Sequence, residues 1–480
     1  KKLTADELKK FRDRLELPIK DEELATGEPP YYHPGMDSKE IQYMLARRHA
    51  LGGVLPERKT TAKPVEHPDP KVYEQFAEGS KQPVSTTMAF VRLLRDLLRD
   101  AKIGKRIVPI IPDEARTFGM ESLFPQFKIY AAHGQLYEPV DAKHLLAYVE
   151  SQDGQILEEG ITEAGSMASF TAAATAYATH GEPMIPFFIF YSMFGFQRIG
   201  DLIWSAGDQR ARGFLLGGTA GRTTLNGEGL QHEDGHSLLL SSTNPACLSY
   251  DPAFAYEIAG IVRDGLHRMY DKSEDVFYYL TLYNENYEQP KMPRGVGEGI
   301  VKGLYRFKKG PNEGKRHHAQ LLGSGPTVNI VLAAQQILAK DWDVSATVWS
   351  ATSYQQLRAD GLDADRWNRL HPAMPRREPY LVQALNGSEG PVVAVTDFMK
   401  AVPDQVARWV RQPFVTLGTD GFGRSDTREA LRRHFEIDAE HIVVATLSAL
   451  ADMGEAKPEQ VAEAIKRYDI DPERTPPAQP

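Results

Sequence analysis

Apolar and polar segments alternate along the chain and predict a series of helices and strands. Near the start, TADELKKFRDRL predicts a charged helix within residues 1–28, and the Pro-, Gly- and charge-rich residues 29–80 predict an extended connector. From residue 85, STTMAFVRLLRDLLRDAK places apolar side chains at helical spacing behind a Ser or Thr cap, which predicts a helix over residues 85–102. The next segment, RIVPIIPDEA, is a short apolar run that ends in acidic residues and predicts a buried parallel strand.

The same alternation continues in two blocks. In the first block, AGSMASFTAAATAYATHG and FQRIGDLIWSAGDQRA predict helices, and PMIPFFIFYSMF and GFLLGGT predict buried strands. The composition changes over residues 290–317, and the alternation then resumes with AQLLGSG, TVNIVLAAQQILAKDW, VSATVWSATS, GPVVAVTDF and later segments. Strands that alternate with helices of this length predict mostly parallel sheets covered on both faces. We therefore predict an α/β fold with domains over residues 63–292 and 293–480, preceded by a helix and connector over residues 1–62.

The composition of the chain narrows the classes of protein to which it can belong. Charged residues make up 25% and hydrophobic residues 41% of the chain, which is typical of a folded protein. The net charge of −9 gives no electrostatic reason to expect a nucleic-acid partner. The first twenty residues are too charged for a signal peptide, and no apolar run reaches the ~18 residues that a membrane span needs. With Cys247 as the only cysteine, a disulfide within the chain is impossible, and we expect a cytoplasmic protein.

The segment LNGEGLQHEDGHS contains a literal match to H-E-x-x-H between His232 and His236. In zinc metallopeptidases this pattern places two histidines on one face of a regular helix, with a glutamate base between them. Gly227, Gly229 and Gly235 argue against such a helix, because each glycine costs roughly 1 kcal/mol in a helix interior. The residues alone leave three interpretations: a zinc site, a functional glycine-rich loop, or histidines that fix the loop by hydrogen bonds.

Other candidate side chains follow the predicted strands. Asp113 and Glu114 are adjacent at a strand end, where open α/β sheets bind ligands, although adjacent acids also cap helices. Glu163, in ILEEGITEAG, is either a carboxyl held where a strand passes into a helix or part of a solvated helix start. Tyr191 and Phe194 follow an aromatic run and belong either to the core or to an aromatic pocket. The glycine loops at 322–325 and 417–426 lack the flanking pattern of a dinucleotide or phosphate loop.

Several long motifs together resemble one family. DEARTFGME, QILEEGITEAG, FYSMFGFQRIGD, AGDQRARGFLLGGTAGRTTLNGEGLQHEDGHS, SYDPAFAYE, LYNENY and LGTDGFGRSDTRE resemble the homodimeric bacterial pyruvate dehydrogenases, which depend on thiamine diphosphate. The resemblance runs in order from about residue 1 to about residue 470. It implies transketolase-like α/β domains, with residues 63–292 similar to the family's pyrimidine-binding domain and residues 293–480 similar to its carboxyl-terminal domain.

The family also has a diphosphate-binding domain that this sequence does not match. The family binds the diphosphate and Mg²⁺ through a GDG motif in a further, upstream domain. This sequence contains RDG at 263–265, ADG at 359–361 and TDG at 419–421, but no GDG. We therefore expect a partial polypeptide with no metal ligand of its own, and residues 1–62 as the tail of the diphosphate-binding domain.

Cofactor contacts are implied residue by residue. Glu163 matches the glutamate whose protonated carboxyl hydrogen-bonds the pyrimidine ring nitrogen and thereby lets the exocyclic nitrogen take a proton from the thiazolium. Phe194 matches the aromatic residue that stacks on the pyrimidine. Ile161 and Tyr191 match other parts of the same pocket.

Substrate contacts are implied in the same way. Asp113 and Glu114 match acids that face the thiazolium, and His232 and Glu228 match residues that orient the substrate or move protons. His236 is expected to be structural.

The resemblance implies decarboxylation of pyruvate and reductive acetylation of a lipoyl group on dihydrolipoamide acetyltransferase. It also implies a homodimer with the cofactor at the subunit interface. The alternatives are another 2-oxo acid dehydrogenase or a transketolase, a zinc metallopeptidase, and a non-catalytic assembly piece.

Overall fold

The computed structural model describes residues 2–53, 62, 64–113, 115–140, 148–311 and 314–479. The chain folds as two units, residues 1–60 and residues 61–480. The first unit contains α1 (Ala5–Arg14), α2 (Asp21–Leu24) and α3 (Lys39–Ala50). Thr4 and Glu7 cap the start of α1 reciprocally, which confirms a helix within residues 1–28.

The expectation of an extended connector over residues 29–80 is wrong in two places. Ser38 caps α3, and basic residues end it, so this helix has favourable groups at both ends. In the second unit, α4 (Lys71–Ala77) follows Pro70 and buries Phe76. Both helices are short, and Pro- and Gly-rich flanks dominate the composition of the segment.

The second unit contains a six-stranded sheet in which every neighbouring pair is parallel. Its strands, in spatial order, are β5 (Leu157–Glu158), β2 (Ile107–Ile111), β6 (Ile185–Tyr191), β7 (Phe214–Gly218), β9 (Phe277–Thr281) and β8 (Cys247–Tyr250). This confirms the strands predicted at RIVPII, PFFIFY and GFLLGG.

Helices cover both faces of this sheet. On one face Phe187 and Phe214 pack with α5 (Thr86–Arg99) and α11 (Ala255–Leu266). On the other face Phe188 and Leu215 pack with α7 (Glu163–Ala174) and α9 (Phe196–Asp208). Alternate strand residues therefore point to opposite buried faces, which explains why the strands are continuously apolar.

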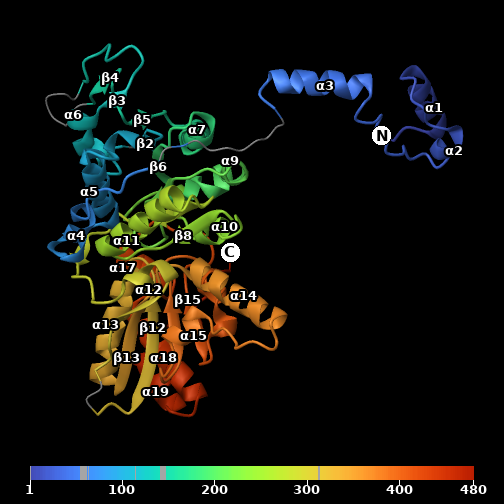
Figure 1. Ribbon diagram of the computed structural model, residues 1–480. Coiled ribbons are helices and arrows are strands. Elements are labelled where there is room, and N and C mark those ends of the chain that lie inside the picture. Colours follow the sequence, from blue (N-terminus) through green and yellow to red (C-terminus); the bar gives the residue numbers. More distant parts are fainter. Residues whose placement is uncertain are drawn as a thin grey trace. The chain divides into compact units, whose positions relative to one another are not determined.

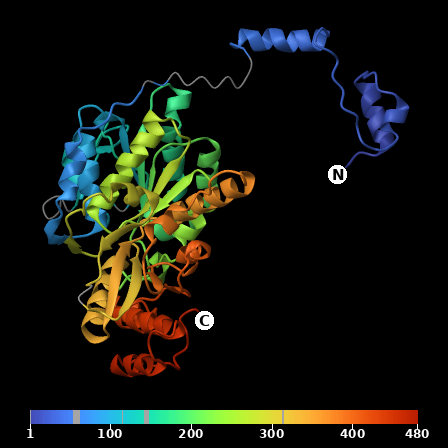
Figure 2. The same ribbon diagram turned by 60° about the horizontal axis from the view of Figure 1, so that its bottom comes forward.

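The carboxyl-terminal part contains a five-stranded sheet with one antiparallel edge. Its strands, in spatial order, are β11 (Tyr305–Lys308), β13 (Val344–Ser350), β12 (His317–Gly323), β14 (Val392–Val395) and β15 (Phe414–Leu417). Its helices are α12 (Gly297–Lys302), α13 (Thr327–Asp341), α14 (Tyr354–Leu370), α15 (Tyr380–Ala384), α16 (Ala401–Asp404), α17 (Arg428–His434), α18 (Ala439–Asp452) and α19 (Pro458–Arg467). In both views α13 lies along the strands, and α19 (red) lies away from the six-stranded sheet (Figures 1 and 2).

Smaller elements complete the second unit. Two short sheets pair β1 (Ser80–Val84) with β10 (Tyr287–Gln289) and β3 (Ile129–Tyr130) with β4 (Glu150–Ser151). The remaining short helices are η1 (Gly104–Arg106), η2 (Met120–Leu123), α6 (Phe124–Phe127), α8 (Ala176–Thr179), η3 (Ser192–Phe194), η4 (Leu230–His232), α10 (Ser237–Ser241), η5 (His267–Asp271) and η6 (Ala407–Trp409). Among the described helices, none combines the length and apolarity needed to cross a membrane.

A buried carboxyl joins the two α/β parts. Glu257 of α11 is fully buried and accepts hydrogen bonds from the hydroxyls of Tyr305 and Ser350, at 2.5 and 2.7 Å, both from the carboxyl-terminal sheet. It also accepts from the amides of Ala253 and Phe254. Burial raises the pKa of Glu257, and the four donors partly offset that cost. The two sheets therefore meet through a specific hydrogen-bonded contact.

Candidate active site

The candidate side chains lie beyond the carboxyl ends of neighbouring strands. Glu163 follows β5, Asp113 follows β2, and Tyr191 is the last residue of β6. After β7 the chain continues into residues 219–236, here called the site loop, which contains η4. Because β5, β2, β6 and β7 are adjacent and parallel, these segments all emerge at one edge of the sheet.

Three aromatic rings gather at this edge. The rings of Tyr191 and His232 stack with their centroids 4.5 Å apart and 12° between planes. Phe194 is steeply inclined to both rings, with its centroid 6.0 Å from that of Tyr191 and 5.6 Å from that of His232. The Nδ1 atom of His232 lies 3.2 Å from Oε2 of Glu228. The structure thus brings the candidate residues Tyr191, Phe194, His232 and Glu228 together.

Glu163 lies beside this aromatic group. It is the first residue of α7, whose N-cap is Thr162, and only 6% of it is exposed. Its carboxylate accepts from Nη1 of Arg198 at 3.2 and 3.3 Å. The guanidinium of Arg198 also lies over the ring of Phe194, 4.0 Å from its centroid. Arg198 therefore connects Glu163 to Phe194.

The remaining candidate residues are Asp113, Ile161 and Glu114. Asp113 is exposed, and within the described residues it makes no hydrogen bond or ion pair with the other candidates. Ile161 is 78% exposed and lies two residues before α7. Glu114 lies outside the described residues. Among the described residues, no hydrogen bond or ion pair joins Asp113 to the aromatic group, and the side chain of Ile161 is largely exposed.

The HEDGH segment is not one regular helix. His232 ends the 3₁₀ turn η4, whereas His236 is the N-cap residue of α10. Asp234 accepts from the amides of His236 and Ser237, each at 3.0 Å, and so fixes this turn. Burial lowers the pKa of His236. His232 thus stacks within the aromatic group, while His236 lies at the start of α10, where its amide donates to Asp234.

Comparison with known proteins identifies the family. Residues 65–290 match the pyruvate dehydrogenase E1 component middle domain, and residues 303–438 match the transketolase-like C-terminal domain. The chain is 53% identical to the pyruvate dehydrogenase E1 component of Pseudomonas aeruginosa, over 99% of this chain and 54% of the relative. It is 56% identical to that of Mycobacterium tuberculosis, over 98% of this chain and 51% of the relative. The chain belongs to the pyruvate dehydrogenase E1 family. It spans about half the length of the curated relatives that it matches.

Solved structures agree on the fold of this pyruvate dehydrogenase E1 family member. A transketolase from Campylobacter jejuni superposes with a TM-score of 0.58 at 17% identity, over 79% of this chain and 49% of the other. Transketolase from Leishmania mexicana gives a TM-score of 0.59 at 16% identity, over 86% of this chain and 52% of the other. The predicted transketolase-like α/β fold is confirmed.

Two groups of side chains near the candidate site were not identified from the sequence. Arg198 lies in α9, whereas Phe194 ends η3 before the break at Gly195, so helical spacing did not indicate their contact. The second group consists of Arg222 and Glu233 of the site loop and Asp397, which follows β14; all three are buried. Burial raises the pKa of Glu233 to about 8 and that of Asp397 to about 7. No local motif indicates this second group, because Asp397 lies far along the chain from the two loop residues.

Proposed function

We propose that this chain supplies the pyrimidine-binding half of a thiamine diphosphate site in a pyruvate dehydrogenase. The reaction is the decarboxylation of pyruvate, followed by reductive acetylation of a lipoyl group on dihydrolipoamide acetyltransferase. The observation that supports this most directly is the contact of Glu163, Arg198 and Phe194, beside the His232 and Tyr191 stack. It combines a buried carboxyl with a flat aromatic face, which are the two groups that bind an aminopyrimidine.

These residues fit the cofactor's pyrimidine. Glu163 is nearly buried, so its carboxyl is held at one place for a hydrogen bond to a ring nitrogen. The guanidinium of Arg198 covers one face of Phe194. A pyrimidine ring that stacks on this face must therefore displace it. Bound thiamine diphosphate supplies the carbon nucleophile and the electron acceptor for decarboxylation. The role of Glu163 is to hold the proton of the hydrogen bond between its carboxyl group and the pyrimidine ring nitrogen.

His232 and Glu228 fit a proton-transfer role toward the substrate. Glu228 pairs with Nδ1 of His232, so Nε2 is the ring nitrogen that can exchange a proton with a substrate. Stacking on Tyr191 orients the imidazole plane. Asp113 and Glu114, after β2, are proposed to face the reacting part of the cofactor from the same sheet edge.

The proposal extends to the assembly. Mg²⁺ and the diphosphate would be held by residues outside this chain, since its sequence has no GDG motif. We further propose a homodimer with the cofactor at the subunit interface and a cytoplasmic location, which agrees with a single, buried cysteine.

The test compares two conservative substitutions in the intact protein. Glu163→Gln is expected to lower lipoyl-dependent release of carbon dioxide from pyruvate by ~100- to 10,000-fold, because an amide cannot exchange the proton. The matched control is Glu159→Gln, whose carboxylate accepts from the Ser169 hydroxyl, and which is expected to keep its activity. Circular dichroism checks that both variants are folded. Near-normal turnover by Glu163→Gln would refute the role of this residue, and a preference for 2-oxoglutarate over pyruvate would refute the substrate.

A further inference from the structure

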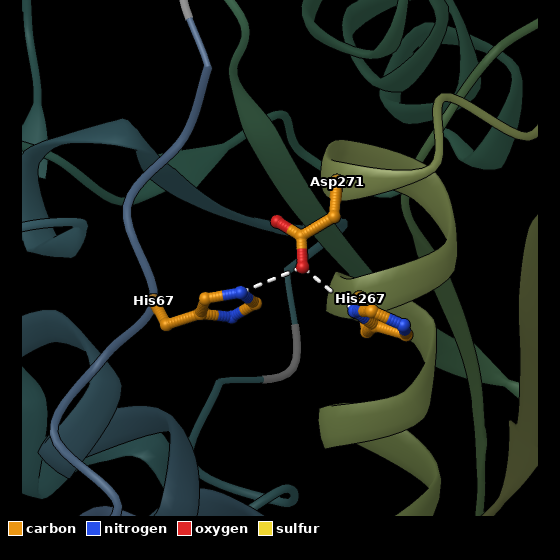
Figure 3. Close-up of side chains that lie close together, drawn as sticks. All are labelled: His67, His267 and Asp271. Atoms are coloured by element: carbon orange, nitrogen blue, oxygen red, sulfur yellow. Dashed lines mark hydrogen bonds and ion pairs between the residues drawn. The ribbon is translucent and has the colours of Figure 1, made fainter.

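Two histidines and an aspartate from distant segments meet on the surface of the second unit (Figure 3). His67 precedes α4, whereas His267 and Asp271 begin and end the π-helical turn η5, after α11. One carboxylate oxygen, Oδ2 of Asp271, lies 2.6 Å from Nε2 of His67 and 2.6 Å from Nδ1 of His267. Two imidazole nitrogens and a carboxylate oxygen therefore converge on one point.

We propose that His67, His267 and Asp271 form a binding site for a divalent transition metal of the zinc class. Two imidazole nitrogens with one carboxylate oxygen are a donor set that Zn²⁺ uses, whereas Ca²⁺ and Mg²⁺ prefer oxygen ligands alone. The three ligand atoms lie within 4.8 Å of one another. Nothing in the proposed pyruvate chemistry uses these residues, so the site is independent of that function.

The geometry requires only a small adjustment. Bond lengths of about 2.0–2.2 Å to zinc place tetrahedral ligand atoms roughly 3.3 Å apart. The two nitrogen–oxygen distances of 2.6 Å must therefore open by roughly 0.7 Å when the metal replaces the shared protons. The side chains of His67 and His267 are 62% and 48% exposed, so both are free to make this movement.

A cavity beside the two histidines has room for water. His67 and His267 also line a cavity of about 810 Å³, together with Tyr73, Arg263 and Asp264. A metal held by three protein ligands and one water has the composition of an open zinc site. Because its ligands are 200 residues apart in sequence, the metal would also tie the segment before α4 to the end of α11.

The experiment uses the intact protein, freed of metal with a chelator and titrated with Zn²⁺ alone by calorimetry. Bound metal is counted by elemental analysis, and Co²⁺ replaces Zn²⁺ to report tetrahedral geometry by its visible absorption. Wild type is expected to bind one more equivalent of Zn²⁺ than Asp271→Asn or His67→Gln. If the variants still bind this equivalent, their affinity for Zn²⁺ is expected to be at least ~100-fold lower than that of wild type. The reason is that losing even a residue that only supports a metal ligand lowers metal affinity about 10- to 100-fold. Hydrogen exchange in residues 64–70 is expected to slow when Zn²⁺ is bound.

The matched control is His133→Gln, which removes an exposed histidine outside the cluster and is expected to bind Zn²⁺ as wild type does. His67→Gln changes a mostly exposed side chain, and its melting temperature in chelator is expected to match that of wild type. No binding by wild type, or equal stoichiometry and affinity in wild type and both cluster variants, would overturn the proposal. Loss of pyruvate turnover in Glu163→Gln does not bear on it, so the two proposals fail separately.

Discussion

Replacing Asp397 by asparagine is expected to remove a pH-dependent loss of stability from residues 61–480. Asp397 is fully buried just after β14, and its two oxygens accept from the Thr223 amide at 3.1 and 3.2 Å. Burial raises its pKa from 3.8 to about 7. A carboxyl whose pKa is raised by folding stabilises the folded state while protonated. This contribution is complete below 3.8 and is lost as the pH rises through about 7.

The size of the effect follows from the two pKa values. Ionising Asp397 in the folded protein costs about 4 kcal/mol in total, and about 2.5 kcal/mol of this falls between about pH 5 and about pH 8. An asparagine side chain has nearly the same volume and stays neutral, so the variant lacks this slope. Glu233 enlarges the difference, because the charge of Asp397 contributes to its raised pKa of about 8.

The assay is urea unfolding at several pH values between about 5 and about 8, followed by tryptophan fluorescence. Trp349 and Trp409 are buried in the carboxyl-terminal part and report on its unfolding. Asp404→Asn, which changes an exposed carboxylate in α16, is the control and is expected to keep the wild-type slope. If wild type and Asp397→Asn give slopes that agree within about 0.5 kcal/mol over this range, the reasoning is refuted.

Three further substitutions test the site and the joint between the sheets. Arg198→Met is expected to tighten thiamine diphosphate binding by ~0.5–2 kcal/mol, measured by calorimetry, because it uncovers the face of Phe194; weaker binding would contradict this. His232→Phe keeps a ring to stack on Tyr191 but loses the exchangeable proton, so kcat is expected to fall by at least ~100-fold with little change in KM, and an unchanged kcat would count against the role. Glu257→Ala leaves four buried donors without their acceptor and is expected to lower the free energy of unfolding by roughly 3 kcal/mol or more. A decrease of less than about 1 kcal/mol would show that the hydrogen bonds of Glu257 between the two sheets contribute little to stability.

The sequence predicted the elements whose signals are local. The helix at residues 86–99 was predicted by apolar spacing behind Ser85, and continuous apolar runs predicted three strands of the six-stranded sheet, β2, β6 and β7. The strands β5, β9 and β8 were not predicted. Strand ends also predicted where the candidate side chains emerge, because parallel strands share one carboxyl edge. By contrast, α3 was not predicted, because the Pro and Gly residues on either side of it dominate the composition of residues 29–80 and indicate an extended segment.

Side-chain pairings across long separations could not be predicted. Arg198 meets Glu163 from a different helix, and a guanidinium can reach many acids once the backbone is folded. The exposure of Ile161 depends on how its short loop leaves β5, which no periodic pattern encodes. The buried pairing of Asp397 with Thr223 joins residues 174 positions apart and follows only from the packing of one sheet against the other.

The contacts of the site loop indicate that the carboxyl-terminal part helps to position this loop. This loop contains Glu228 and His232, and residues beyond 390 bind it at several points. The Thr223 amide donates to Asp397, the Gly227 amide donates to the Asp426 carbonyl, and carbonyls of the loop accept from Arg428 and from the Met399 amide. Because each contact fixes backbone on one side or the other of His232, a shift of the carboxyl-terminal sheet displaces the imidazole from Tyr191. Activity is therefore expected to depend on residues that touch neither cofactor nor substrate.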